Sequence, residues 1–298
     1  MNAISREQGG AHATIVPIAS HNATQTSYLP EQSPFTTLFV DLTHRCNMAC
    51  RNCYIPNRDI PDMPADWLYA ILARLPRRTR IRLVGAEPTV RNDLPQIIAR
   101  VRELRHLPIV LTNGLRMRTR GYVRRLKAAG MRTVHLSMNG GLDDGLYLEI
   151  DSMECADAKL AALRNLCAEH VFVTVGMILV RGVNTDHLRD FWRHLKELRE
   201  VREIHFRNVG AGGRYLETQS FTLAEMRDVV LDALGTDRPP ARVTYDGTNG
   251  CNIWLDGRKL VITQWPELGN RWRGRLTPAG TLEPCFEHMM ANAALGGY

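Results

Sequence analysis

Apolar and polar positions along the chain follow two alternating periods. Short β-prone apolar runs predict strands, and the stretches between them, with apolar side chains at helical spacing, predict helices. The expected strands cover residues 36–42, 80–84, 108–112, 133–137, 171–180 and 203–207, and the expected helices cover residues 66–75, 92–106, 119–129, 156–169 and 186–200. Six strands that alternate with helices predict an α/β fold, a partial (β/α)6 TIM-like barrel with its active groups at the carboxyl ends of the strands.

The pattern changes after residue 210. A helix is expected at residues 222–234, followed by a linker at Pro239-Pro240 and short β-prone runs at residues 242–245, 252–255 and 259–263. The first 34 residues are rich in small polar side chains and show no apolar period. We therefore predict an extension at residues 1–34, a barrel at 35–210 and a small β-rich region at 211–298 that covers the substrate.

Length and composition indicate a protein that folds around its own core. The chain has 298 residues, 44% of them hydrophobic, and no apolar stretch approaches the length that spans a bilayer. Its first residues lack the basic start and apolar run of a secretory signal, and seven cysteines suit a reducing compartment better than a disulfide scaffold. We expect a cytoplasmic protein with no membrane partner.

The net charge of +7 has two interpretations. Arginines cluster at residues 77–82, at 116–120 and at 124–125, which suits either a nucleic-acid surface or the solvated faces of outer helices. Aromatic residues do not interleave the clusters, as stacking on bases requires. The pattern favours solvated helices and no nucleic-acid partner.

Three cysteines form the main candidate site. Cys46, Cys50 and Cys53 follow the first predicted strand in one short loop, which turns three thiolates toward a common point. Three thiolates on a [4Fe-4S] cluster leave one iron without a protein ligand. The alternative is a structural zinc site, for which only His44 lies near enough to be a fourth ligand.

The spacing Cys-x-x-x-Cys-x-x-Cys, followed by Tyr54 and preceded by an apolar strand, resembles the signature of the radical S-adenosylmethionine (SAM) enzymes. The resemblance implies that SAM binds the open iron and that one electron cleaves it to a 5'-deoxyadenosyl radical. This radical removes a hydrogen atom from the substrate. An electron donor such as flavodoxin or ferredoxin is the implied partner.

Further segments resemble the SAM-binding parts of this family. Gly85-Ala86-Glu87-Pro88 is similar to the Gly-Gly-Glu-Pro turn that holds the amino group of SAM, with Ala86 in place of the usual glycine. Two later strand ends resemble the segments that approach the ribose and the carboxylate of SAM, although Asn-Gly turns also arise from ordinary turn chemistry. The residues are Thr112, Asn113, Ser137 and Asn139, and Arg207 after the sixth strand either contacts the cofactor or pairs on the surface.

The carboxyl-terminal region resembles an incomplete auxiliary-cluster ("twitch") domain. Residues 275–286 are similar to its hairpin, but Asn270 and its neighbours stand where the family places a Cys-x-x-Cys pair. A conventional second cluster is therefore not expected. The cysteines outside the loop are Cys155, Cys167, Cys251 and Cys285.

Cys251 lies in a polar, glycine-rich turn at residues 246–252, where a backbone can approach a ligand closely. A thiol in such a place can return a hydrogen atom to a carbon radical, because an S–H bond is weaker than a typical C–H bond. The arrangement resembles the aminoglycoside epimerases of the radical SAM family, which invert a sugar carbon in neomycin-type antibiotics. It implies Cys251 as the catalytic donor and an aminoglycoside as the small-molecule substrate.

Three alternatives stay open at this point. A dehydrogenase would need a second cluster held by the remaining cysteines, a peptide epimerase would differ only in its substrate, and a basic nucleic-acid or scaffold module would use the metal structurally. Because aminoglycosides are polycations, their epimerase needs local acids, and the candidates are Glu149, Asp151, Glu217 and Asp246.

Overall fold

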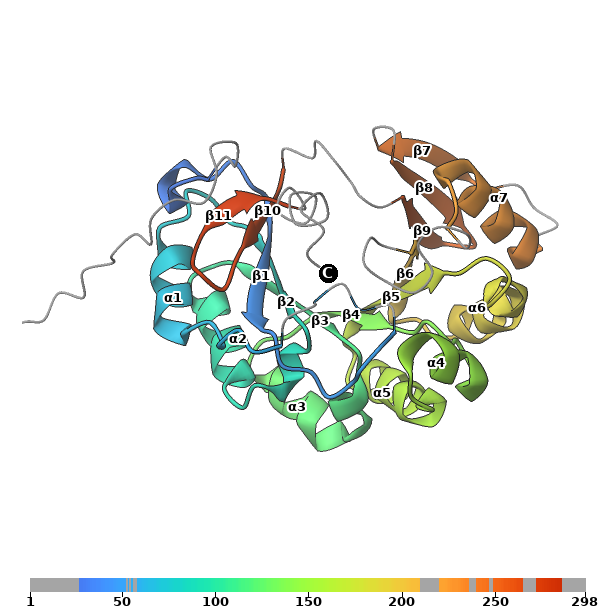
Figure 1. Ribbon diagram of the computed structural model, residues 1–298, viewed down its shortest axis with the longest axis horizontal. Coiled ribbons are helices and arrows are strands. Elements are labelled where there is room, and N and C mark those ends of the chain that lie inside the picture. Colours follow the sequence, from blue (N-terminus) through green and yellow to red (C-terminus); the bar gives the residue numbers. More distant parts are fainter. Residues whose placement is uncertain are drawn as a thin grey trace, which may run out of the picture.

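The computed structural model describes residues 27–51, 53, 55, 58–209, 220–235, 240–246, 249–264 and 272–285. Its centre is a parallel sheet of six strands in sequential order, as the sequence predicts (Figure 1). The strands are β1 (Thr37–Thr43), β2 (Arg80–Gly85), β3 (Leu107–Thr112), β4 (Thr133–Ser137), β5 (Phe172–Leu179) and β6 (Val201–Asn208). The parallel arrangement sets the carboxyl ends of all six strands along one rim.

Helices cover the outer face of this sheet (Figure 1). They are α1 (Ala65–Ala73), α2 (Leu94–Glu103), α3 (Arg120–Ala128), α5 (Ala156–Ala168) and α6 (Leu188–Lys196), each within a few residues of its predicted position. Single turns of 3-10 helix lie at η1 (Pro30–Gln32), η2 (Pro88–Val90), η3 (Leu115–Arg118) and η4 (Thr185–His187). In the described part of the chain, no helix is both long and apolar enough to cross a membrane.

One helix was not predicted from the sequence. Helix α4 (Asp144–Asp151) occupies the connection after β4, where Asp143 caps its first turn by accepting a hydrogen bond from the Leu146 amide. Its apolar residues do not all lie on one face, since Tyr147 and Ile150 are fully buried whereas Leu148 is exposed. Tertiary packing of these two side chains therefore stabilises a short helix that has little amphipathic pattern of its own.

The sheet remains open, and the carboxyl-terminal region extends both of its edges to eleven strands in all. Beside β6 lie β9 (Arg258–Thr263), β8 (Gly250–Leu255) and β7 (Arg242–Asp246), and beside β1 lie β10 (Arg273–Leu276) and β11 (Leu282–Pro284). Helix α7 (Leu223–Leu234) contacts β6, β8 and β9. The predicted third segment therefore shares one sheet with the barrel and flanks its concave face on two sides.

A buried ion pair fixes the β10 edge. Arg275 Nε donates to Asp41 Oδ2 at 2.6 Å, and the two residues are 6% and 1% exposed. Because β10 is only four residues long, this pair adds a specific contact to a short ladder with β1. It holds Arg273, two residues earlier, beside the concave face of the sheet.

Candidate functional site

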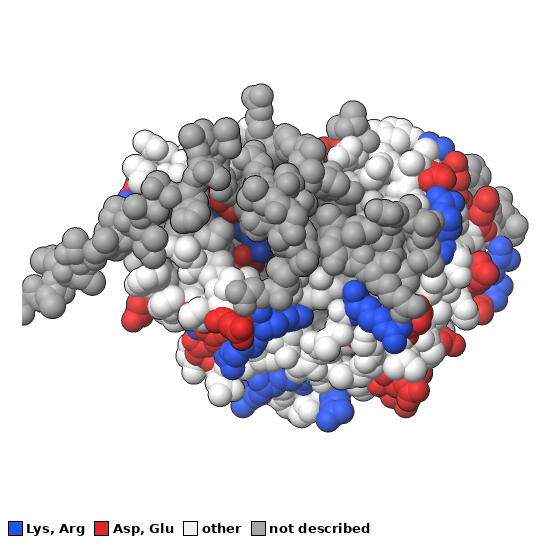
Figure 2. All heavy atoms as spheres, in the orientation of Figure 1, with Lys and Arg blue, Asp and Glu red and all other residues white. Residues whose placement is uncertain are grey.

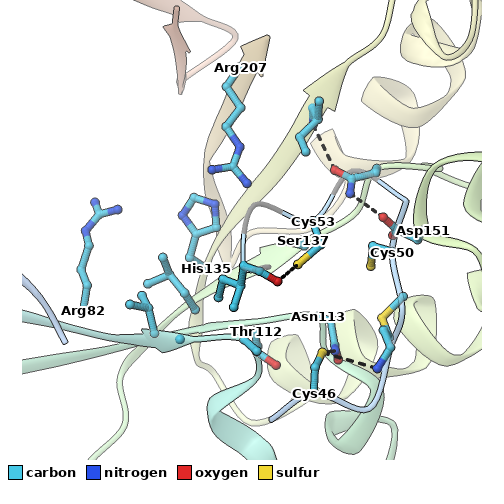
Figure 3. Close-up of a pocket in the computed structure, with 18 of the residues that line it drawn as sticks. Cys46, Cys50, Cys53, Arg82, Thr112, Asn113, His135, Ser137, Asp151 and Arg207 are labelled. Atoms are coloured by element: carbon cyan, nitrogen blue, oxygen red, sulfur yellow. Dashed lines mark hydrogen bonds between the residues drawn. The ribbon is translucent and has the colours of Figure 1, made fainter. Parts of the chain in front are cut away.

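A cavity of about 220 Å³ lies on the concave side of the sheet, at the carboxyl ends of the strands. Figure 3 shows the three loop cysteines at one end of it and Arg82 at the other, with His135 between them. The cysteines come from the loop after β1, Arg82 from β2 and His135 from β4. The cavity therefore joins a sulfur-rich end to a basic end.

The loop presents three free thiols to this cavity. Cys46, Cys50 and Cys53 all line it and none forms a disulfide. The Met48 amide donates to Cys46 Sγ at 3.4 Å, and Arg58 Nη2 donates to Cys53 Sγ at 3.0 Å. Such donors stabilise sulfur that carries negative charge.

The donor set fits an iron–sulfur cluster better than a single metal ion. Among the residues that the structure describes, no three His, Cys, Asp or Glu side chains converge closely enough to hold one ion, as zinc requires. In a [4Fe-4S] cluster each thiolate binds a different iron, so wider spacing is suitable. Burial, and next the charge of Asp151, raise the pKa of Cys50 to about 12. Its ionisation therefore depends on bound iron.

The turn after β2 requires its glycine. Gly85 has a φ of +117°, and a Cβ atom there would lie 2.1 Å from the carbonyl oxygen of Thr43. Gly85 and Ala86 both line the cavity, and the Ala86 amide donates to the Thr43 carbonyl at 2.8 Å. This close approach brings backbone of the β2 turn against the start of the cysteine loop.

Glu87 lies outside the cavity lining and stabilises the turn after β2 through hydrogen bonds. Its fully buried carboxylate accepts hydrogen bonds from the Thr89 amide and hydroxyl, from the Thr112 hydroxyl at 2.7 Å and from the Asn113 amide at 2.7 Å. Neither Glu87 nor Pro88 lines the cavity. The side chain of Glu87 therefore has a positioning role, because it joins the ends of β2 and β3. The predicted approach of the backbone of Glu87 and Pro88 to the cofactor stays a prediction.

The other predicted strand-end residues do reach the cavity. Thr112, Asn113, Ser137, Asn139 and Arg207 all line it, and the structure thus brings together segments that are far apart in sequence. Tyr54, the remaining predicted cofactor contact, lies outside the described residues.

A buried ion pair beside Cys50 was not foreseen. Lys159 Nζ lies 3.4 Å from Asp151 Oδ2, and both side chains are almost inaccessible. Asn139 Nδ2 donates to the other oxygen of Asp151 at 2.8 Å, and Lys159 donates to the Ser137 carbonyl at 2.9 Å. Asp151, a predicted contact for an amino group of the substrate, therefore already has two partners.

Three arginines form the basic end of the cavity. Arg82, Arg207 and Arg273 line it from β2, β6 and β10. Arg82 stacks over the ring of Phe39, and its Nε is buried without a hydrogen-bond partner. Burial, and next the charge of Arg273, lower the pKa of Arg82. A buried guanidinium NH of this kind is suited to an anionic ligand.

Two histidines separate the arginines from the thiols. His135 and His205 meet edge to face with ring centroids 5.7 Å apart, and His205 Nε2 lies 2.9 Å from the Thr263 hydroxyl. Burial lowers the pKa of both imidazoles well below 6.5, and the Arg82 and Arg207 charges add to the effect. Both rings are therefore neutral at pH 7. Sequence analysis missed them, although a histidine inside an apolar β4 run was a visible signal.

Cys251 faces away from the cavity. It pairs with Ile262 in the β8–β9 ladder, is fully buried in the main hydrophobic core and has the charge of Arg227 on α7 near it. Gly250 already belongs to β8, and the ladder register directs the side chain of the next residue toward α7. The predicted catalytic role of Cys251 therefore lacks the contact with the cavity that it needs.

The other cysteines lie in three different places. Cys167 is half-buried on α5, and Cys155 packs near the loop cysteines outside the cavity. Cys285 lies opposite Arg273 on the β10–β11 hairpin, where its amide donates to the Arg273 carbonyl at 3.0 Å. Cys285 is buried and lies near enough to Arg82 for the two side chains to interact electrostatically, although it is not among the residues that line the cavity.

The remaining predicted acids do not form a polycation site. Glu149 pairs with Arg51 at 3.2 Å, and Asp246 is exposed at the end of β7. Glu217 lies outside the described residues. The described lining of the cavity holds five Lys or Arg side chains and one carboxylate, that of Asp151.

Comparison with known proteins identifies one family. Residues 40–195, more than half of the chain, match the family model described as the radical SAM superfamily. The matched segment begins in β1, includes the cysteine loop and ends in α6.

Curated relatives match more than half of the chain. The chain is 32% identical over 208 residues to a 7,8-dihydro-6-hydroxymethylpterin dimethyltransferase of Methanocaldococcus jannaschii, covering 65% of this chain and 39% of that protein. It is 27% identical over 176 residues to a probable GTP 3',8-cyclase of Pyrococcus abyssi, and the match covers 57% of this chain and 56% of that protein. The chain therefore spans about half or less of the length of these relatives.

Solved structures share the fold. SuiB of Streptococcus suis bound to its precursor peptide SuiA superposes with a TM-score of 0.66 and 16% identity, over 88% of this chain and 60% of that one. SuiB bound to S-adenosylmethionine superposes with a TM-score of 0.64 and 15% identity, over 85% of this chain and 60% of that one. Identity this low shows a common fold alone.

Proposed function

Because this chain belongs to the radical SAM superfamily, we propose that it removes a hydrogen atom from a small substrate that bears a phosphate or carboxylate group. The observation that carries the proposal is the buried, unpartnered Nε of Arg82 at the basic end of the cavity. Radical formation then takes place at the thiol end of the cavity, and the substrate binds at the basic end.

Members of the superfamily use a [4Fe-4S] cluster and SAM, and the residues of this chain fit both. Cys46, Cys50 and Cys53 would hold three irons, while Gly85 and Ala86 present backbone to the neighbouring space. When bound, the two cofactors supply the 5'-deoxyadenosyl radical. The chain itself positions the cysteine loop and orients the substrate.

The positive charge of the cavity lining favours one class of substrate over another. A phosphate or carboxylate gains a charge-assisted hydrogen bond from a guanidinium whose Nε is otherwise buried without a partner among the described residues. An aminoglycoside brings several ammonium groups instead, and the single carboxylate of the described lining, Asp151, is already bound to Lys159 and Asn139. The cavity thus favours an acidic substrate over the polycation expected from the sequence.

The relatives supply a first compound to test. GTP is named by the cyclase relatives and carries phosphates, so it suits a basic cavity. His135 and His205, held neutral, add hydrogen-bonding capacity to the same wall without adding charge. We expect a phosphate-bearing nucleotide or pterin to bind, with its phosphate toward Arg82.

The test is substrate-dependent formation of 5'-deoxyadenosine by the reconstituted, reduced enzyme under anaerobic conditions. GTP should raise the yield over the substrate-free level, and Arg82→Gln should raise the KM for GTP at least tenfold. Arg78→Gln, at an exposed position before β2, is the matched control and should leave the KM unchanged. Stimulation by neomycin C and not by GTP or other phosphates would overturn the acidic-substrate proposal.

An epimerase is the second candidate, and Cys285 is the observation that favours it. Its thiol lies near Arg82, and its amide is bound to Arg273 on the β10–β11 hairpin. A thiol there can return a hydrogen atom to a substrate carbon radical. The resulting thiyl radical then regains one electron and one proton from the reductant and water. The net reaction inverts a stereocentre.

This candidate is tested with neomycin C, and with phosphorylated sugars, in deuterated water. An epimerase would place one solvent-derived deuterium in the inverted product. Cys285→Ala should still form 5'-deoxyadenosine but give no epimer, whereas Cys251→Ala should remain active because its thiol faces α7. The reverse pattern would restore Cys251 as the donor and reject the assignment to Cys285.

A further inference from the structure

A second groove, of about 470 Å³, lies outside the barrel next to the cysteine loop. Its walls come from η3, α3 and the segment between α4 and α5. Figure 2 shows Lys and Arg side chains gathered along the lower part of the molecule, where Figure 1 places α3. The groove is separate from the cavity on the concave side and shares only the cysteine loop with it.

The groove is basic, and its charges are available. Arg116, Arg118 and Arg125 line it together with one acid, Glu154. None of these arginines forms an ion pair with a described residue, whereas Arg120 and Arg124, which lie on α3 with Arg125, both pair with Glu169. The arginines of η3 and α3 that line the groove therefore produce a positive field, whereas the charges of Arg120 and Arg124 are neutralised by Glu169.

Its basic side chains are held in place. Arg116 and Arg125 both lie over the ring of Tyr122, with guanidinium carbons 5.0 and 5.2 Å from the ring centroid. Arg116 also donates to the carbonyl oxygen of Thr89. These contacts reduce the entropy that the arginines would lose on binding a partner.

The floor of the groove packs directly against the loop thiols. Leu115, Met153 and Cys155 belong to a small apolar cluster that also contains Cys46 and Cys50. Asn47, an exposed residue of the loop, lines the groove and accepts a hydrogen bond from Asn113 Nδ2 at 2.8 Å. A protein seated there would be separated from the thiols by a single layer of side chains.

We propose that this groove is the docking site for an acidic one-electron carrier protein that reduces the cluster. The carrier loses one electron and the cluster gains it, with no bond formed and no proton required. Association of an acidic surface with fixed arginines is fast and salt-sensitive, which suits a transient redox encounter. The electron would pass through the layer of side chains, Leu115, Met153 and Cys155, that separates the groove from the loop thiols.

Nucleic acid fits the groove less well. The one aromatic ring in it, Tyr122, is buried and covered by Arg116 and Arg125, so no base can stack on it. The substrate has its own cavity on the other side of the loop. Position, charge and access to the thiols together favour a redox protein.

The experiment measures the rate at which reduced flavodoxin reduces the oxidised cluster of the full chain, followed by stopped-flow absorbance without substrate. Arg118→Glu/Arg125→Glu should slow the second-order rate at least tenfold and weaken its dependence on salt. The matched control is Arg78→Glu/Arg105→Glu, in a second basic groove at the amino ends of β2 and β3. Its rate should stay within twofold of the wild-type rate.

Reduction by dithionite distinguishes a loss of flavodoxin docking from damage to the cluster. Iron content and the rate of reduction by dithionite should be equal in all three proteins, since a small reductant needs no docking surface. If both double variants slow flavodoxin equally, net charge rather than this groove directs the encounter and the proposal fails. It also fails if the groove variant is unaffected, or if it loses binding to duplex DNA while keeping its flavodoxin rate.

Discussion

A Cβ atom at Gly176 would lie 2.2 Å from Nε2 of His135. Gly176 lies opposite Ser137 in the β4–β5 ladder, two residues from His135 along β4. The absence of a side chain at Gly176 therefore makes the space in which the His135 ring lines the cavity. The lack of a side chain at Gly176 on β5 thus determines where the imidazole of His135 on β4 can lie.

The first prediction follows from that contact. Gly176→Ala should displace the His135 ring and reduce substrate-dependent turnover at least tenfold, while iron content and SAM binding stay at wild-type levels. Gly121→Ala, on α3 where a new Cβ meets nothing within 4 Å, is the matched control and should be neutral. Equal activity of the two variants would show that the His135 position is unimportant.

The neutral histidines predict a dependence of stability on pH. Burial lowers the folded-state pKa of His135 and His205 well below 6.5, so below pH 6.5 the unfolded chain binds more protons than the folded chain. The free energy of unfolding should therefore fall as the pH falls below 6.5, by up to about 1.4 kcal/mol per pH unit for each imidazole.

Urea unfolding at pH 7.5, 6.5 and 5.5 measures this effect under anaerobic conditions. His135→Gln should flatten the decrease between pH 6.5 and 5.5 relative to wild type. His187→Gln, at a solvent-accessible site in η4, should keep the wild-type slope. An unchanged slope in His135→Gln would show that the imidazole is not held neutral by the fold.

Glu87 is expected to matter for folding as well as for the cavity. Glu87→Gln replaces one acceptor oxygen of the buried carboxylate with an NH₂ group, which leaves the Thr112 hydroxyl or the Asn113 amide without its acceptor. The expected loss is about 1–3 kcal/mol in the free energy of unfolding. Glu103→Gln, at the exposed end of α2, should change it by less than about 0.5 kcal/mol.

The Asp41–Arg275 pair predicts a cooperative role for the last hairpin. Arg275→Met leaves the buried Asp41 carboxylate without its cation and should cost about 3–5 kcal/mol. Amides of β10 should then exchange with deuterium faster than those of β3. A double variant, Asp41→Leu/Arg275→Met, should recover part of the loss. If the single variant is as stable as wild type, the pair does not hold the hairpin.

Much of the fold and part of the site could be predicted from sequence because their signals are local. The strand period, the helical spacing of apolar residues and the spacing of Cys46, Cys50 and Cys53 all lie within short windows. The position of Ala86 in the turn after β2 was also visible, since backbone turns depend on a few neighbouring residues.

The face to which a strand residue points depends on pairing between distant segments. Cys251 follows a glycine-rich turn, which suggested access to a ligand, but the register with Ile262 directs its thiol into the core. Cys285 comes near Arg82 only because the distant β10–β11 hairpin pairs with β1. The histidine pair and the Asp151–Lys159 pair form only when strands and helices assemble.

The most direct test of the account is to measure iron and 5'-deoxyadenosine together in the anaerobically reconstituted protein. We predict about four irons per chain, and reduction in the presence of SAM should yield 5'-deoxyadenosine. Replacing Cys46, Cys50 and Cys53 together by Ala should abolish both, whereas Cys167→Ala should change neither. Stoichiometric zinc, or a reduced cluster that leaves SAM intact, would contradict the radical mechanism assigned to this cavity.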